Sequence, residues 1–125
     1  MSIPRLALLA ALVLLAAYVW GNSQPEAAGL IPAPWDKLAH LVWYAILAGL
    51  LLLGLGRRAW PWVLAGTLLF AGWDEWHQFA LPGRSAGMDD WLADAFGVVT
   101  GILITHKIGR RFGAAGPTGL MERRR

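Results

Sequence analysis

The length of the apolar segments constrains the fold of this chain most strongly. Four hydrophobic blocks, at about residues 3–21, 36–55, 60–80 and 89–108, are each close to the roughly 20 residues that a helix needs to cross a bilayer. Hydrophobic residues make up 57% of the 125 residues, and charged residues only 15%. A soluble domain of this size could not bury so much apolar surface. The sequence therefore predicts an all-α integral membrane bundle of four transmembrane helices, forming a single domain over residues 1–108.

The segments outside the blocks fit this prediction. Prolines exclude helix from residues 22–35, and the short connection at 56–59 forces blocks two and three into an antiparallel hairpin. Residues 109–125 are basic and rich in glycine, and we expect a disordered cytoplasmic tail. A cleavable signal peptide is the alternative for block one. We expect the block to be retained, because no clear small-x-small cleavage site follows it and Trp20 suits an interfacial anchor.

The distribution of Lys and Arg predicts the orientation. Of the 11 basic residues, only Lys37 and Arg84 fall on the side opposite the N-terminus. Basic residues are enriched in cytoplasmic segments, so we expect both termini inside a bacterial inner membrane. The net charge of +3 is therefore explained by the basic residues that set the orientation in the membrane. For this reason we expect no nucleic-acid partner.

Ionisable side chains gather at the outer ends of three blocks. The stretch from Trp73 to Arg84 follows a long apolar run, although one aspartate at the centre of a spanning helix costs roughly 3 kcal/mol on insertion scales. A rise of 1.5 Å per residue places the polar groups of the three blocks at a similar depth, on the order of 5 to 10 Å below the outer boundary. The groups concerned are Asp36, Lys37 and His40, then Asp74, Glu75, His77 and Gln78, then Asp89, Asp90 and Asp94.

Helical periodicity also predicts which residues share a face. The three expected faces are Asp36, His40, Trp43 and Leu47; Asp74, His77, Gln78 and Leu81; and Asp90, Asp94, Gly97, Gly101 and Thr105. His40 would face Asp36 or Asp74, while Glu75 lies about 100° around its helix from Asp74 and can point elsewhere. Lys37 and Asp89 are expected as solvated rim residues. Gly97 and Gly101 form a small-xxx-small pattern, which allows a neighbouring helix to come close beneath Asp94.

The charge balance of this cluster indicates a chemical capacity. Its carboxylates outnumber Lys37 and Arg84, and partly buried like charges cannot all stay ionised. Protonated carboxyls, protonated histidines or a bound divalent cation would each resolve the excess. The chain has no cysteine, which excludes a thiolate nucleophile and a thiolate zinc site. The sequence has no His-x-x-x-His spacing, so whether the protein uses a metal cofactor stays open.

Several of these residues also form a pattern that resembles the VanZ-like family of small bacterial membrane proteins. The pattern consists of Asp36-Lys37-x-x-His40 with Tyr44, then Asp74-Glu75-x-His77-Gln78, then Pro82-Gly83-Arg84, followed by Asp90, Gly97 and Gly101. It covers residues 36–101. The chain departs from the family at Asp94, where the family carries asparagine. The resemblance implies a bacterial membrane protein, with some members linked to teicoplanin resistance, and it implies no settled reaction.

Three classes of function remain open. An enzyme at the outer leaflet would use Asp74, His77, His40 and Asp90 as candidate acid/base residues, while Arg84, Gln78, Glu75, Asp94, Asp36 and Tyr44 bind the substrate. A non-catalytic module would bind a lipid headgroup, an envelope precursor or an antibiotic with the same residues. An ion or proton pathway is the weakest class, because the helices below the cluster are apolar. The expected partners are membrane lipid and a lipid-linked or anionic envelope substrate; interhelical hydrogen bonding that only holds the bundle is the structural alternative.

Overall fold

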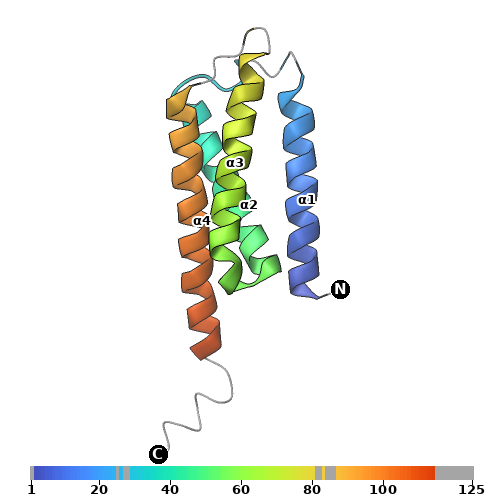
Figure 1. Ribbon diagram of the computed structural model, residues 1–125, viewed down its shortest axis with the longest axis vertical. Helices are drawn as coiled ribbons and strands as arrows, with labels where there is room; N and C mark the ends of the chain where they lie inside the picture. The colour runs from blue at the N-terminus through green and yellow to red at the C-terminus, as the bar shows by residue number, and fades with distance from the viewer. Residues whose placement is uncertain (1, 25, 27–28, 81–82, 84–86, 115–125) are drawn as a thin grey trace, which may run out of the picture.

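The computed structural model describes residues 2–24, 26, 29–80, 83 and 87–114, with side chains described up to Gly109. The elements are α1 (Ile3–Asn22), α2 (Trp35–Leu55), the short 3-10 helix η2 (Arg57–Ala59), α3 (Trp60–Phe79) and α4 (Met88–Ala114). The four α-helices lie side by side along the long axis of the molecule (Figure 1). No strand occurs in the described part of the chain, so the predicted all-α bundle is confirmed.

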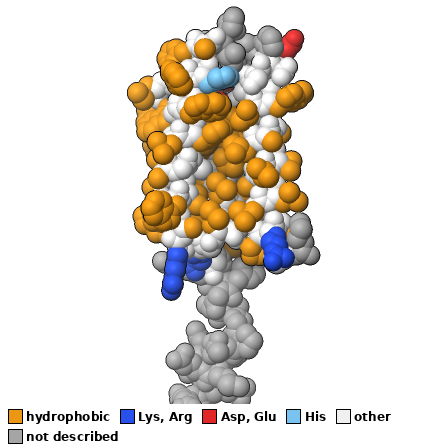
Figure 2. Space-filling model, turned by 45° about the vertical axis from the view of Figure 1, so that its right-hand side comes forward, with side chains coloured by type: hydrophobic (Ala, Val, Ile, Leu, Met, Phe, Trp, Pro, Cys, Tyr) orange, Lys and Arg blue, Asp and Glu red, His pale blue; other side chains and the backbone are white. Residues whose placement is uncertain are grey.

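Three of the helices are long and apolar enough to cross a membrane, namely α1, α2 and the Met88–Gly109 part of α4. Helices α2 and α4 both run from the upper end of the bundle to the lower end (Figure 1). Helix α3, which connects them in the sequence, therefore runs in the opposite direction, from the lower end back to the upper end. The described Lys and Arg side chains visible on one face lie at the lower end, with hydrophobic side chains covering the middle (Figure 2). The chain is therefore a membrane protein, and the cytoplasmic placement of its termini stays a prediction.

Local sequence signals explain the hairpin between α2 and α3. Gly56 has a φ of 89°, which favours glycine, and its N–H donates to the carbonyl of Leu52 at 3.0 Å to end α2. Pro61 occupies the first turn of α3, where its missing N–H costs nothing. Helix α4 continues to Ala114, beyond the expected end at 108, so the first residues of the expected tail are helical. Residues 115–125 lie outside the described residues.

The core of the bundle lies mainly between α2 and α4, which pack more extensively than any other pair of helices. Gly97 lies on the backbone of Leu41, and Gly101 lies on the backbone of Ala45. The expected close approach at the small-xxx-small pattern is therefore confirmed, with α2 as the neighbour. Buried side chains complete the core: Tyr44, Ala48 and Leu52 of α2, Val63 and Ala71 of α3, and Val98 and Ile102 of α4. Helix α1 packs against α2 from the other side.

Candidate functional site

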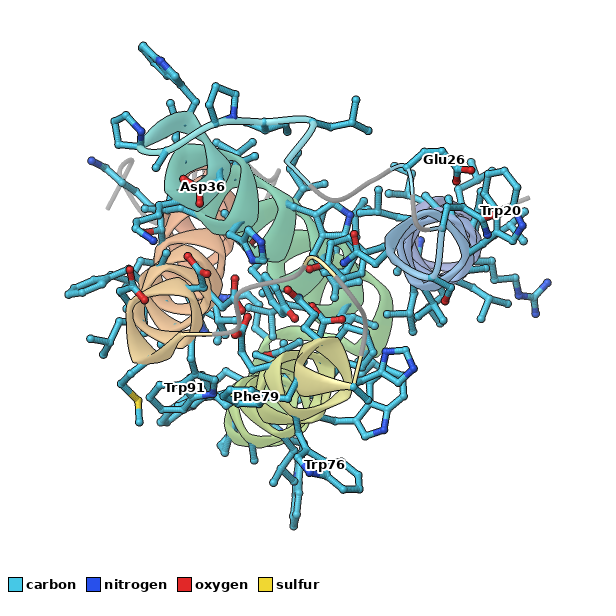
Figure 3. All side chains as sticks on the ribbon, turned by 90° about the horizontal axis from the view of Figure 1, so that it is seen from above. Trp20, Glu26, Asp36, Trp76, Phe79 and Trp91 are labelled. Carbon is cyan, nitrogen blue, oxygen red and sulfur yellow. The ribbon has the colours of Figure 1, made fainter. Side chains whose placement is uncertain are left out.

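The buried acidic residues of α3 and α4 meet at the upper end of the bundle. Asp74 and Glu75 come from α3, Asp90 and Asp94 come from α4, and all four are buried. Figure 3 looks onto this end, where side-chain oxygens and nitrogens gather in the space between the helices. We call these four residues, together with Lys37 and His40 of α2, the polar cluster.

The centre of the polar cluster is the pair formed by His40 and Asp94. His40 Nδ1 lies 2.8 Å from Asp94 Oδ1, and Asp94 is fully buried. The sequence placed His40 opposite Asp36 or Asp74, and the structure differs. Because Gly97 brings α4 onto the α2 backbone, the side chain one turn above it meets the α2 residue at the same depth.

Asp74 accepts two hydrogen bonds from described residues. The Tyr18 hydroxyl donates to Oδ2 at 2.7 Å, and Gln78 Nε2 donates to the same oxygen at 2.9 Å. Tyr18 belongs to α1 and was missed by the sequence analysis, although it is the only residue of that apolar helix whose side chain combines a ring with a hydroxyl. The Tyr18 ring stacks on Trp43 with a centroid distance of 3.9 Å. Helix α1 therefore forms one wall of the site.

The sequence spacing placed His77 on the face of Asp74 and let Glu75 point elsewhere, and the structure shows the reverse. Glu75 is buried in the cluster, and its Oε2 accepts a hydrogen bond from the N–H of Gly87 at 2.9 Å. His77 is half-buried and stacks on Trp73 with a centroid distance of 5.3 Å. At about 100° per residue, the buried arc runs from Asp74 through Gln78 to Glu75, and His77 falls outside it. The expected shared face therefore holds for Asp74 and Gln78 but not for His77.

Lys37 connects the first turns of α2 and α4. Its Nζ lies 2.6 Å from Asp89 Oδ2 and 2.7 Å from Asp90 Oδ1, and the nearest oxygen of Asp36 is 4.0 Å away. The expected rim lysine is thus an ion-pair partner of a buried carboxylate. Such a pair is worth little at the surface but matters where one partner is buried.

Three candidate residues complete the comparison with the sequence. Tyr44 is fully buried, and its hydroxyl has no hydrogen-bond partner among the described residues. Asp36 likewise has a buried oxygen, Oδ1, without a described partner. Arg84 lies outside the described residues, so the structure does not place this candidate.

A pocket of about 970 Å³ lies beside the cluster, between the end of α1, the α1–α2 connection and the first turns of α2. Its volume is in the upper part of the range of small-molecule sites. Polar lining residues are Tyr18, Asn22, Gln24, Glu26, Asp36, His40 and Gln78, and apolar ones include Leu30, Ile31 and Trp43. The described lining carries two acidic residues and no Lys or Arg. It therefore favours hydroxyl or amino groups on a ligand.

The arrangement supports two kinds of chemistry. Asp94 can orient the His40 imidazole and stabilise its protonated form, as acid/base catalysis requires. One ligand atom each of His40, Glu75 and Asp94 also lies within 4.8 Å of the others, a grouping that could hold a metal ion.

Comparison with known proteins places the whole bundle in one family. The family model described as VanZ/LLP1 matches residues 4–109, from the first turn of α1 to the end of the described side chains in α4. No curated protein and no solved structure matches the chain. Because the family match includes every helix that builds the polar cluster, the chain belongs to the VanZ/LLP1 family of membrane proteins.

Proposed function

We propose that this protein binds the headgroup of a lipid-linked cell-envelope substrate at the extracytoplasmic face of a bacterial inner membrane. The observation that carries the proposal is the pocket of about 970 Å³ that leads to the His40–Asp94 pair. The excess of Lys and Arg at the other end of the bundle supports the outward orientation of this end.

The lining of the pocket favours an amphiphilic ligand. Trp43, Leu30 and Ile31 offer apolar surface, while Gln78 and the acidic residues Glu26 and Asp36 offer polar groups. A headgroup with hydroxyl or amino donors, such as a sugar or an amino sugar, can satisfy these acceptors. A lipid tail would remain among the exposed apolar side chains of the bundle, which already face the hydrocarbon.

The geometry of His40 favours an enzyme over a simple binding module. Its Nδ1 lies 2.8 Å from an oxygen of the fully buried Asp94, and the residue lines the pocket, so a bound headgroup can reach the imidazole ring. A histidine held in this way can take a proton from a hydroxyl and return it to a leaving group. A role in glycopeptide resistance, including teicoplanin resistance, would follow from a change in the envelope substrate. Binding without conversion is the second candidate.

Native mass spectrometry of the protein in lipid nanodiscs tests the binding step. A lipid extract of bacterial membranes is added, and the retained lipids are identified. We expect the parent to retain a glycolipid or amino lipid, and Asp36→Asn to weaken retention about tenfold, the effect of losing about one hydrogen bond to a charged group. Asp89→Asn is the matched control, because Asp89 is exposed and does not line the pocket. Equal retention by both variants, or no retained amphiphile, would refute the proposal.

The same preparation distinguishes catalysis from binding. Incubation of the retained lipid with the parent should yield a product that differs in its headgroup. His40→Gln should retain the lipid but form no product, because the glutamine amide still forms hydrogen bonds but cannot gain and lose a proton near neutral pH. Retention without conversion by the parent would favour the non-catalytic candidate.

A further inference from the structure

Three helices each contribute one metal-ligating side chain to the same point in the polar cluster. His40 comes from α2, Glu75 from α3 and Asp94 from α4, and one ligand atom of each lies within 4.8 Å of the others. Glu75 is 7% exposed and Asp94 is 0% exposed, so water reaches neither carboxylate freely. Because the three residues are far apart in the sequence, they do not form a recognisable sequence motif.

Two oxygens in this set have no hydrogen-bond partner in the described part of the chain. Asp94 Oδ2 and Glu75 Oε1 are buried and accept no hydrogen bond from the described residues. Buried polar atoms are almost always paired, and a buried carboxylate oxygen without a donor or cation is costly. Both oxygens therefore require an additional partner.

The neighbouring donors that form hydrogen bonds or ion pairs in the described chain already serve other carboxylates, and the Tyr44 hydroxyl, which has no described partner, donates to neither oxygen. Tyr18 and Gln78 both donate to Asp74, and Lys37 pairs with Asp89 and Asp90. Among the described residues, Glu75 accepts a hydrogen bond from one backbone N–H, and Asp94 pairs with His40 alone. With both carboxylates ionised and the imidazole neutral, the set carries two negative charges, which a divalent cation would neutralise in full.

We propose that His40, Glu75 and Asp94 bind a divalent transition-metal ion, with Zn²⁺ as the best fit to one imidazole nitrogen and two carboxylate oxygens. Ligand atoms around tetrahedral zinc at about 2.1 Å lie roughly 3.4 Å apart, so atoms that already lie within 4.8 Å of one another need to move only a short way to bind one ion. Three protein ligands leave one position for water or a ligand, as in catalytic zinc sites. The proposal does not depend on the lipid-linked substrate, because metal binding is measured without it.

Metal content and unfolding of the purified parent give the first test. The protein carries a purification tag without histidine, is stripped with a chelator and is then loaded with Zn²⁺. We expect about one tightly held zinc per chain, and a higher midpoint of thermal unfolding with zinc than with chelator. X-ray absorption of the loaded parent should show a single imidazole ligand with oxygen donors. No tight zinc, or a site with two imidazoles, would overturn the proposal.

Three pairs of identical substitutions give the second test. His40→Gln, Asp94→Asn and Glu75→Gln should each weaken zinc binding by about tenfold or more, since losing even a supporting partner has that effect. The matched controls are His77→Gln, Asp89→Asn and Glu26→Gln, whose side chains lie outside the three-residue set. We expect the controls to bind zinc like the parent. Equal weakening in a variant and its control, or no weakening in any, would show surface-bound zinc only. If a variant does not fold, the absorption spectrum of the parent decides the question.

Discussion

A single methyl group at Gly101 should destabilise the bundle, because the space for it is occupied by backbone. A Cβ at this position would lie 2.9 Å from the carbonyl carbon of Ala45 and 3.0 Å from its Cα, with the carbonyl oxygen closer still. These atoms belong to α2 and cannot rotate away, so the two helices must separate. Overpacking of this kind costs about 1–3 kcal/mol, and the higher helix propensity of alanine returns about 1 kcal/mol. Because a backbone neighbour places the cost in the upper part of its range, we expect Gly101→Ala to lower the free energy of unfolding by about 1–2 kcal/mol.

Gly66→Ala is the matched control for this prediction. Gly66 lies within α3, and a Cβ there would meet no atom within 4 Å. The control gains helix propensity without a clash, so it should raise the free energy of unfolding by about 0.5–1 kcal/mol. Both variants are compared with the parent by unfolding in mixed micelles with increasing fractions of denaturing detergent. If Gly101→Ala is as stable as Gly66→Ala, α2 and α4 do not make the close contact described above.

Two further predictions concern the first helix and the orientation of the chain. Tyr18→Phe removes the donor to Asp74 and should lower the free energy of unfolding by about 1 kcal/mol. Tyr44→Phe should lower it much less, because the Tyr44 hydroxyl has no described partner. Equal losses in the same micelle assay would contradict the hydrogen bond from Tyr18 to Asp74. Reporter fusions after Arg58 and at the C-terminus should report the cytoplasm, and a fusion after Arg84 should report the outside, since basic residues favour the cytoplasmic side. A cytoplasmic signal after Arg84 would reverse the orientation and remove the basis for an envelope substrate.

The helices were predictable because their signals are local. The lengths of the apolar segments predicted the four helices, and Gly56 and Pro61 predicted the tight hairpin between α2 and α3. The continuation of α4 to Ala114 was missed for a physical reason. Hydropathy marks the end of the apolar surface, whereas arginine and alanine beyond it still favour the helical backbone.

The candidate site was predictable only in part, because it depends on how the helices are rotated against one another. The rise per residue placed Asp74 and Asp94 at a common depth, and the structure has both buried there. The partners of these groups could not be deduced. The pairing of His40 with Asp94 follows from the contact between α2 and α4, and the bond from Tyr18 to Asp74 follows from the position of α1. A single sequence contains the period of each helix but not the register between helices.

The backbone contact at Gly97 and Gly101 has a mechanical consequence for the site. Two helices that touch through their main chains have no layer of side chains between them that could rearrange. The wall carrying His40 and Asp94 is therefore a stiff frame, whose spacing is set by the closest approach of two peptide backbones. Helix α1 packs against α2 and is also linked to α3 through the hydroxyl of Tyr18. A ligand that enters the pocket beside α1 and α2 would therefore meet His40 on a frame that holds α2 and α4 at a fixed separation.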